Sequence, residues 1–242
     1  MRWPEYSSTN PSLRKLLEGF LNPAYQALSQ RIDAAARRAG RMVRLLAVSK
    51  TKPAAAIRQV AALGQRAFGE NYVQEAVAKQ RELADLELEW HMIGPLQSNK
   101  CREVAQHFDW LQSLDREKLI APLDRFRTSE RPPLNVLIQV NIDDEASKSG
   151  CASDEVPDLA QKIAAAKHLR LRGLMTIPEP DPDLQKRRRA FQNMRALFER
   201  LRANYASVDT LSMGMSEDFE LAIEEGATMV RIGTAVFGKR DT

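Results

Sequence analysis

The amino-acid sequence predicts an α/β protein built as a single (β/α)8 TIM barrel, with an extra helix at its N-terminus. Eight short apolar runs begin at residue 44 and alternate with longer segments of helical pattern. The runs are continuously apolar, which is typical of strands buried on both faces of a parallel sheet. The chain has 242 residues, close to the roughly 250 of a typical barrel, and each repeat is about 24 residues long. No GxGxxG motif follows the first run, which disfavours a dinucleotide-binding sheet.

The eight expected strands are residues 44–51, 67–71, 89–94, 110–114, 135–141, 169–177, 210–215 and 229–238. Helical patterns occupy residues 54–63, 73–86, 100–108 and 156–167 between them. Apolar residues at helical spacing also run from Leu13 to Ala35, and Gly40 marks the end of that helix. We expect one domain over residues 1–242, with the barrel proper at about residues 44–238.

The composition excludes several classes of protein. No run reaches the roughly 18 apolar residues that a membrane span needs, and the first residues lack the apolar core of a signal peptide. We therefore expect a cytoplasmic protein. Cys101 and Cys151 form no CxxC pair and no metal-binding spacing with the three histidines. They are predicted to be reduced, structural thiols, and no metal site is expected.

The net charge of +4 is weak support for a nucleic-acid partner, because 36 basic residues are set against 32 acidic ones. The strongest basic segment is residues 184–204, whose apolar stripe consists of Phe191, Met194, Leu197, Phe198 and Leu201. This pattern favours the solvated face of an outer barrel helix over contact with RNA or a membrane. A nucleic-acid-binding barrel remains an alternative, which salt-dependent RNA binding through Arg187, Arg188 and Arg189 would support.

Chemistry in a barrel of this kind sits at the carboxyl ends of the strands. Lys50 ends the first run, and strand alternation places it on the same face as Val48. The pKa of a lysine in such a barrel end tends to fall, which frees its amine to attack an aldehyde. The alternative is a lysine that reaches water or pairs with a carboxylate.

The seventh and eighth runs end in residues suited to bind an oxyanion. Gly214 and Gly233 allow the backbone to approach a phosphate closely, and Ser212 and Thr234 add hydroxyl donors. Ser216 is predicted to be a helix N-cap, with the two acidic residues after it in the first turn. Ordinary turn chemistry is the alternative for each loop. A lysine on the first strand together with a phosphate site predicts pyridoxal 5′-phosphate (PLP), which carries both an aldehyde and a phosphate.

Seven blocks in chain order then resemble a known family. They are residues 47–53 (AVSKTKP), 68–75 (FGENYVQE), 90–100 (WHMIGPLQSNK), 139–142 with 148–150 (QVNI and KSG), 173–176 (GLMT), 211–216 (LSMGMS) and 231–238 (RIGTAVFG). The blocks are similar to those of the pyridoxal phosphate homeostasis proteins, the YggS/PROSC-like family. That family has the PLP-binding barrel of the alanine racemase N-terminal domain.

The resemblance implies roles for eight residues. Lys50 forms the Schiff base with PLP, Asn71 lies near the ring, and Arg231 faces the pyridine nitrogen. The phosphate is held by Ser212, Gly233 and Thr234, with backbone groups around Met213 and Gly214. The implied function is a non-catalytic PLP-binding protein of vitamin B6 and amino-acid homeostasis, which buffers the cofactor or delivers it to apo PLP-dependent enzymes.

Two enzymatic alternatives remain. A cationic Arg231 disfavours protonation of the ring nitrogen and makes the cofactor a poorer electron sink. A racemase also needs a second base. Alanine racemase takes a tyrosine from a second domain of a partner subunit, and we expect no such domain here. Tyr72 is the nearest candidate here and is expected to pack against the site or gate it. A Schiff-base aldolase would need a carboxylate, and alternation turns Glu70, the obvious candidate, outward.

Two further residues have open roles. His91 is expected to be a satisfied core histidine, with a contact to the cofactor as the alternative. Lys148 is hypothesised to receive PLP during transfer to or from Lys50, the alternative being a solvated loop lysine. We expect a monomer rather than a dimer, with no nucleic-acid or membrane partner.

Overall fold

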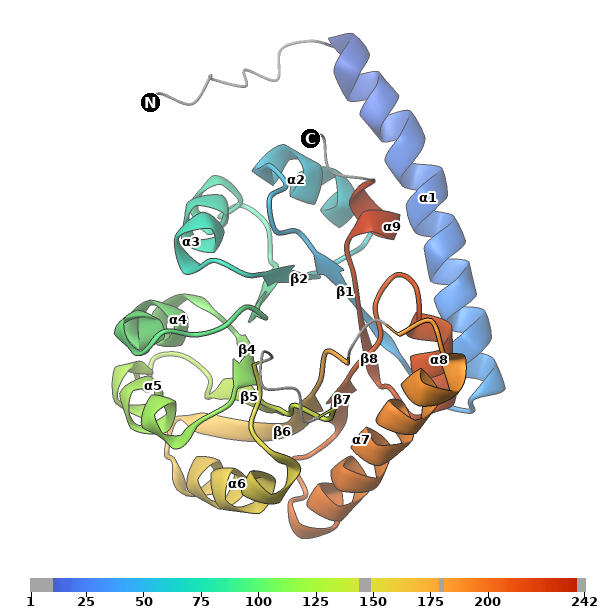
Figure 1. The fold of residues 1–242 in the computed structure, drawn as a ribbon. Coiled ribbons are helices and arrows are strands. Elements are labelled where there is room, and N and C mark those ends of the chain that lie inside the picture. Colours follow the sequence, from blue (N-terminus) through green and yellow to red (C-terminus); the bar gives the residue numbers. More distant parts are fainter. Residues whose placement is uncertain (1–10, 144–148, 179–180, 239–242) are drawn as a thin grey trace.

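The computed structural model describes residues 11–143, 149–178 and 181–238, with side chains from residue 23 onward. Eight parallel strands pair in chain order and close into a barrel, and the helices that follow them form an outer ring (Figure 1). The predicted fold class is therefore confirmed. The strands are β1 (Arg44–Val48), β2 (Ala67–Glu70), β3 (Glu89–Met92), β4 (Trp110–Leu114), β5 (Leu134–Gln139), β6 (Leu169–Met175), β7 (Thr210–Ser212) and β8 (Met229–Ile232).

The described helices are α1 (Pro11–Arg38), α2 (Ala54–Ala62), α3 (Val73–Glu82), α4 (Cys101–His107), α5 (Ile120–Phe126), α6 (Val156–Ala165), α7 (Leu184–Asn204), α8 (Phe219–Glu224) and α9 (Thr234–Phe237). Seven of the eight predicted strands run past the carboxyl end of the observed strand, and two of these ends matter for the site. The seventh strand ends at Ser212, earlier than predicted, and Gly214 then adopts a positive φ of 94°. The eighth ends at Ile232, and the residues after Gly233 turn into α9 instead of continuing the strand.

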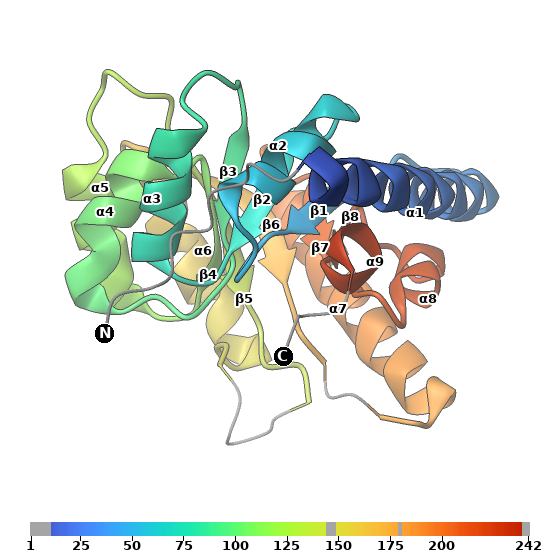
Figure 2. The ribbon, with the colours of Figure 1, turned by 90° about the horizontal axis from the view of Figure 1, so that it is seen from above.

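Helix α1 lies outside the barrel and packs along α8, α9 and α2 (Figures 1 and 2). Leu28, Ile32 and Ala35 recur at helical spacing and are buried in that contact. Pro23 lies inside this helix without ending it. The predicted stop at Gly40 is confirmed, because this glycine has a left-handed φ of 63° directly after the helix.

The hydrophobic core has two layers. The larger layer fills the space between the strands and the outer helices, and it includes the apolar stripe predicted for α7. The barrel interior is smaller, with one cluster around Leu46 and Met229 and another around Trp110 and Met175. The rest of the interior is polar, and these polar residues connect to the candidate site.

Both cysteines are free and buried, as a structural role predicts. Burial raises the pKa of the Cys101 thiol and raises that of Cys151 to about 12, which keeps both thiols protonated and unreactive. On the basic helix α7, Arg188 pairs with Glu224 and Glu225. Among the described residues, no helix is both long enough and apolar enough to cross a membrane.

Candidate functional site

Lys50 directly follows β1 at the carboxyl end of the barrel and is partly buried. Two residues earlier, Val48 packs against the interior cluster around Leu46. Ser49 faces the opposite way, and its hydroxyl donates to Glu70 Oε1 at 2.5 Å. The outward orientation predicted for Glu70 is therefore confirmed, and alternation directs Lys50 toward the barrel interior.

Arg231 places a buried charge inside this end of the barrel. It pairs in register with Leu46 of the neighbouring strand, so it lies deeper than Lys50. Its guanidinium donates to Ser212 Oγ at 2.7 Å and to the carbonyl oxygen of Thr176 at 2.6 Å. Burial lowers the pKa of Arg231 to about 10, partly offset by the charge of Asp218. Arg231 is therefore a cation at neutral pH, and both of these acceptors are uncharged.

A chain of buried hydrogen bonds continues from Ser212 to the other end of the barrel. The Ser212 hydroxyl donates to Gln112 Oε1 at 2.7 Å, and Gln112 Nε2 lies 2.9 Å from His91 Nδ1. His91 Nε2 lies 2.7 Å from Glu89 Oε1, which also accepts from Arg44 at 2.6 Å. Because the Gln112 amide donates to Nδ1, the His91 proton resides on Nε2 and points to Glu89. We call this series, from Arg231 to Glu89, the interior relay.

We expect His91 to stay neutral in the folded protein. Burial lowers its pKa below the usual 6.5, although the hydrogen bond to Glu89 opposes the shift. The unfolded state then binds the extra proton first, so the free energy of unfolding should fall as the pH drops below about 6.5. Ring ¹⁵N chemical shifts at pH 6 should report a neutral imidazole protonated on Nε2. An imidazolium at that pH would contradict the relay.

The backbone at the ends of β7 and β8 comes close to its neighbours. A Cβ on Gly233 would lie 3.2 Å from the carbonyl oxygen of Val48, which places the start of α9 beside the strand that carries Lys50. A Cβ on Gly214 would lie 2.6 Å from the Cβ of Ala222. Position 214 therefore requires glycine, because any side chain would clash there and the positive φ disfavours other residues. Lys52 Nζ reaches the carbonyl oxygen of Phe237 at 3.4 Å, at the other end of α9.

The predicted N-cap is wrong. Helix α8 begins at Phe219, three residues after Ser216, and Asp218 occupies the N-cap position. The Asp218 carboxylate accepts the backbone N–H of Met215 at 2.7 Å, which closes a turn between β7 and the helix. The N–H groups that a Ser216 cap would bind, those of Asp218 and Phe219, donate instead to the carbonyl oxygen of Met215.

The structure gathers most of the predicted residues at the carboxyl end of the barrel. Ser212 is fully buried and belongs to the relay, while the Met213 side chain is buried in the outer core. Thr234 is exposed at the first turn of α9, and Asn71 is partly buried directly after β2. Tyr72 is 62% exposed, so it does not pack against the site, and its alternative role as a gate stays a prediction. Lys148 lies outside the described residues.

These residues fit PLP by the chemistry of their donors. Lys50 provides an amine, and Arg231 provides a buried cation whose hydrogen-bond acceptors are neutral. Gly233 brings the backbone close to Val48 of β1, and Gly214 lets the end of β7 pack closely against α8. An amine, a cation and two glycine loops match an aldehyde, a ring nitrogen and a phosphate, respectively.

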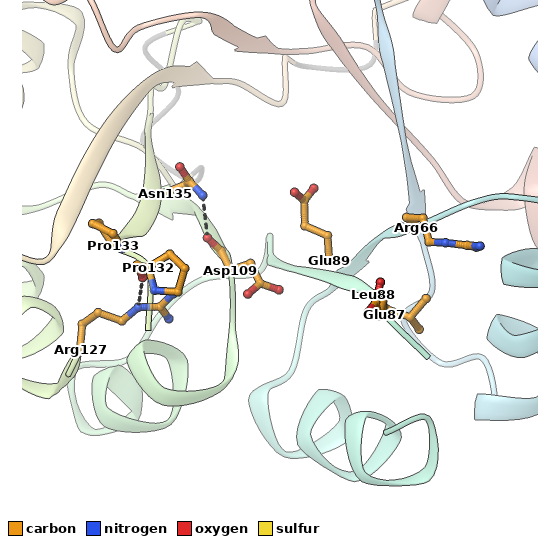
Figure 3. Close-up of a pocket in the computed structure, with 9 residues that line it drawn as sticks. All are labelled: Arg66, Glu87, Leu88, Glu89, Asp109, Arg127, Pro132, Pro133 and Asn135. Carbon is orange, nitrogen blue, oxygen red and sulfur yellow. Dashed lines mark hydrogen bonds between the residues drawn. The ribbon is translucent and has the colours of Figure 1, made fainter. Parts of the chain in front are cut away.

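A pocket of about 390 Å³ lies at the opposite end of the barrel (Figure 3). It is lined by Arg66, Glu87, Leu88, Glu89, Asp109, Arg127, Pro132, Pro133 and Asn135. These residues lie at the amino-terminal ends of the strands, where barrels carry stabilising residues rather than catalytic ones. The Arg127 guanidinium fits this role, because it donates to the carbonyl oxygens of Ala105, Phe108 and Pro132 at 2.6–2.8 Å.

Replacing Arg127 by methionine should destabilise the protein by about 3 kcal/mol, because two buried carbonyl groups and a third, partly buried one lose their donor. The side chain is 2% exposed, so water cannot easily replace it. Chemical denaturation of both proteins measures the difference. Arg131→Met is the matched control on the same surface, where the side chain is one-third exposed and the loss should be below about 1 kcal/mol. Equal losses for the two variants would contradict the assignment.

Comparison with known proteins identifies the family of this chain. Residues 24–241 match the family described as alanine racemase, N-terminal domain. The chain is 56% identical over 217 residues to a pyridoxal phosphate homeostasis protein of Pseudomonas aeruginosa, covering 88% of this chain and 93% of that protein. The protein of the same name from Escherichia coli K12 is 54% identical, covering 87% and 93%. The chain belongs to the pyridoxal phosphate homeostasis protein family.

Solved structures with a similar fold include a PLP-bound protein. PipY of Synechococcus elongatus, in a structure described as having PLP bound, has a TM-score of 0.77 at 38% identity. That match covers 90% of this homeostasis-family chain and all of PipY. Alanine racemase of Corynebacterium glutamicum has a TM-score of 0.63 at 21% identity, and the chain covers 62% of its length. The racemase likeness shows the barrel fold alone.

Sequence reasoning missed part of the site of this family member. Gln112 lies within an apolar strand, and nothing in the sequence indicates that it joins His91 to Ser212 across the barrel. The expectation that His91 is a satisfied core histidine agrees with its two partners. A polar residue inside a buried strand was the available signal for Gln112, because buried polar side chains require partners.

Proposed function

We propose that this protein binds PLP at the carboxyl end of its barrel and acts in PLP homeostasis, holding the cofactor covalently through Lys50. The observation that carries the proposal is the placement of Lys50 above Arg231 on the inner face of two paired strands. Membership of the homeostasis family and the PLP-bound relative PipY support it. Bound PLP supplies an aldehyde that a lysine amine can hold covalently with loss of one water.

The other residues have separate tasks in this proposal. Arg231 would contact the ring nitrogen, and Ser212 and Thr176 fix the orientation of its guanidinium. The backbone around Met213 and Gly214, together with Gly233 and Thr234, holds the phosphate. The Ser212 hydroxyl already contacts Arg231 and Gln112, so in this proposal it orients Arg231 and does not hold the phosphate. Asn71 flanks the ring from the end of β2.

The protein is proposed to bind PLP without catalysing a reaction on it. A protonated Arg231 beside the ring nitrogen keeps that nitrogen unprotonated and limits electron withdrawal. Glu70, the candidate acid or base on β2, faces away from the barrel interior. Tyr72, the candidate second base, is largely exposed to solvent. Buffering PLP, or delivering it to apo-enzymes, requires reversible covalent binding and none of these groups.

The test is covalent trapping. The purified protein is incubated with PLP, reduced with borohydride and analysed by intact mass and peptide mapping. One PLP-sized adduct per chain, located on Lys50, is expected, and an apo PLP-dependent enzyme should recover activity when mixed with the unreduced complex. Absence of any adduct would overturn the proposal. Formation of a D-amino acid from its L-isomer, at a rate that depends on Lys50, would favour a racemase instead.

A further inference from the structure

The two residues that flank Lys50 are both tied to helix α3. Lys79 Nζ donates to the carbonyl oxygen of Ser49 at 2.8 Å, and the Ser49 hydroxyl donates to Glu70 Oε1. On the other side of Lys50, the backbone N–H of Thr51 donates to Glu75 Oε1 at 2.6 Å. Lys79 joins these two contacts, because its ammonium also pairs with Glu70 and Glu75 at 2.7 Å each.

This group of charges is expensive to bury. The Lys79 side chain is 7% exposed and that of Glu70 is fully buried. Burial raises the pKa of Glu70, although Lys79 and Ser49 act against the shift. Glu70 Oε2 has no hydrogen-bond partner among the described residues. Apolar side chains of similar volume would stabilise such a site at least as well, so stability alone does not explain these residues.

Thr51 adds strain at the same place. Its φ is 65°, the only positive value among the described residues other than glycine. A β-branched residue is disfavoured in the left-handed region, so the surrounding contacts must hold it there. The Glu75 carboxylate supplies such a contact, because it accepts the N–H of Thr51. The backbone turn that follows Lys50 is therefore held from helix α3.

We infer that Lys79, with Glu70 and Glu75, forms a positioning clamp that fixes the backbone on both sides of Lys50 and directs its amine into the barrel. The inference rests on the proposed function, because it assigns Lys50 the covalent bond to PLP. The clamp lies on the outer side of the barrel and contacts Ser49 and Thr51, not Lys50 itself, in the hydrogen bonds described above. Its members are therefore positioning residues. They also account for FGENYVQE, a motif whose two glutamates the binding site leaves unexplained.

The test compares rates of covalent uptake. Lys79→Met and Glu75→Ala are mixed with PLP, quenched with borohydride at successive times and mapped for the adduct on Lys50. Both are expected to slow labelling of Lys50 roughly tenfold or more, since small displacements of a reacting group are costly. Glu75→Gln keeps an oxygen that can accept from Thr51 and should restore most of the rate. Glu82→Ala, on the same helix, should react as the wild type does.

Arg127→Met is the control for a loss of stability alone. It should lower the melting temperature and leave the rate of PLP uptake by the folded protein unchanged. If Lys79→Met fails to fold, Glu75→Ala decides the question, because Glu75 is partly exposed. Folded Glu75→Ala that labels Lys50 at the wild-type rate would overturn the clamp and leave the proposed function intact. Wild-type protein that forms no adduct would overturn the proposed function, and the clamp with it.

Discussion

Lys50→Ala is expected to abolish covalent retention of PLP. The amine on Lys50 is the group that the first strand directs into the barrel, while Ser49 and Thr51 on either side of it are engaged with α3. Alanine leaves the strand pairing of β1 intact, because Lys50 lies beyond its last paired residue. The phosphate loops and Arg231 also remain, so the variant should still bind PLP weakly and reversibly.

Borohydride reduction followed by intact mass measures this effect, with an expected change from about one adduct per chain to none. Lys52→Ala is the matched control, because Lys52 lies two residues away and donates to the carbonyl oxygens of Phe237 and Gly238. That control should keep the adduct. An adduct of undiminished yield in Lys50→Ala would assign the covalent bond to another lysine.

Arg231→Met should weaken the retention of PLP by roughly tenfold to a hundredfold, with the covalent bond to Lys50 still able to form. The variant removes a charged donor, and hydrogen bonds to charged groups contribute about 1.5–3 kcal/mol. The loss in the free energy of unfolding should be smaller than the loss in binding free energy. A buried cation without a hydrogen-bonded carboxylate partner is itself costly to fold, so its removal is partly compensated. Ser212 would lose one donor and keep Gln112.

Titration with PLP, followed by the absorbance of the bound cofactor, gives the dissociation constant. Arg172→Met is the matched control, since Arg172 also reaches into the barrel but pairs with Asp209 and lies over Trp110. PLP affinity should be unchanged in that control. Equal affinity of Arg231→Met and wild type would remove Arg231 from the proposed binding site.

Much of the fold was predictable because it depends on short-range patterns. Apolar runs marked all eight strands, and their alternation with helices indicated a barrel. Strand ends were less predictable. The segment after Gly233 is as apolar as a strand but turns into α9, because the pairing of β8 with β1 ends at Ile232 and offers no further strand partner there. The N-cap predicted at Ser216 was wrong because helix α8 begins later. Asp218 precedes the helix and accepts the backbone N–H of Met215.

The sequence by itself determined the class of fold and the candidate cofactor, through a lysine at the end of one strand and glycines at the ends of two others. It also determined that Glu70 faces outward, because strand alternation is a local rule. Only the tertiary structure decided which side chains act on those residues. Arg231 is joined to His91 through Gln112, and Lys50 is flanked by contacts from Lys79. Such partners come from strands and helices far apart in the chain. They meet only when the barrel closes and brings their buried polar groups within hydrogen-bonding distance.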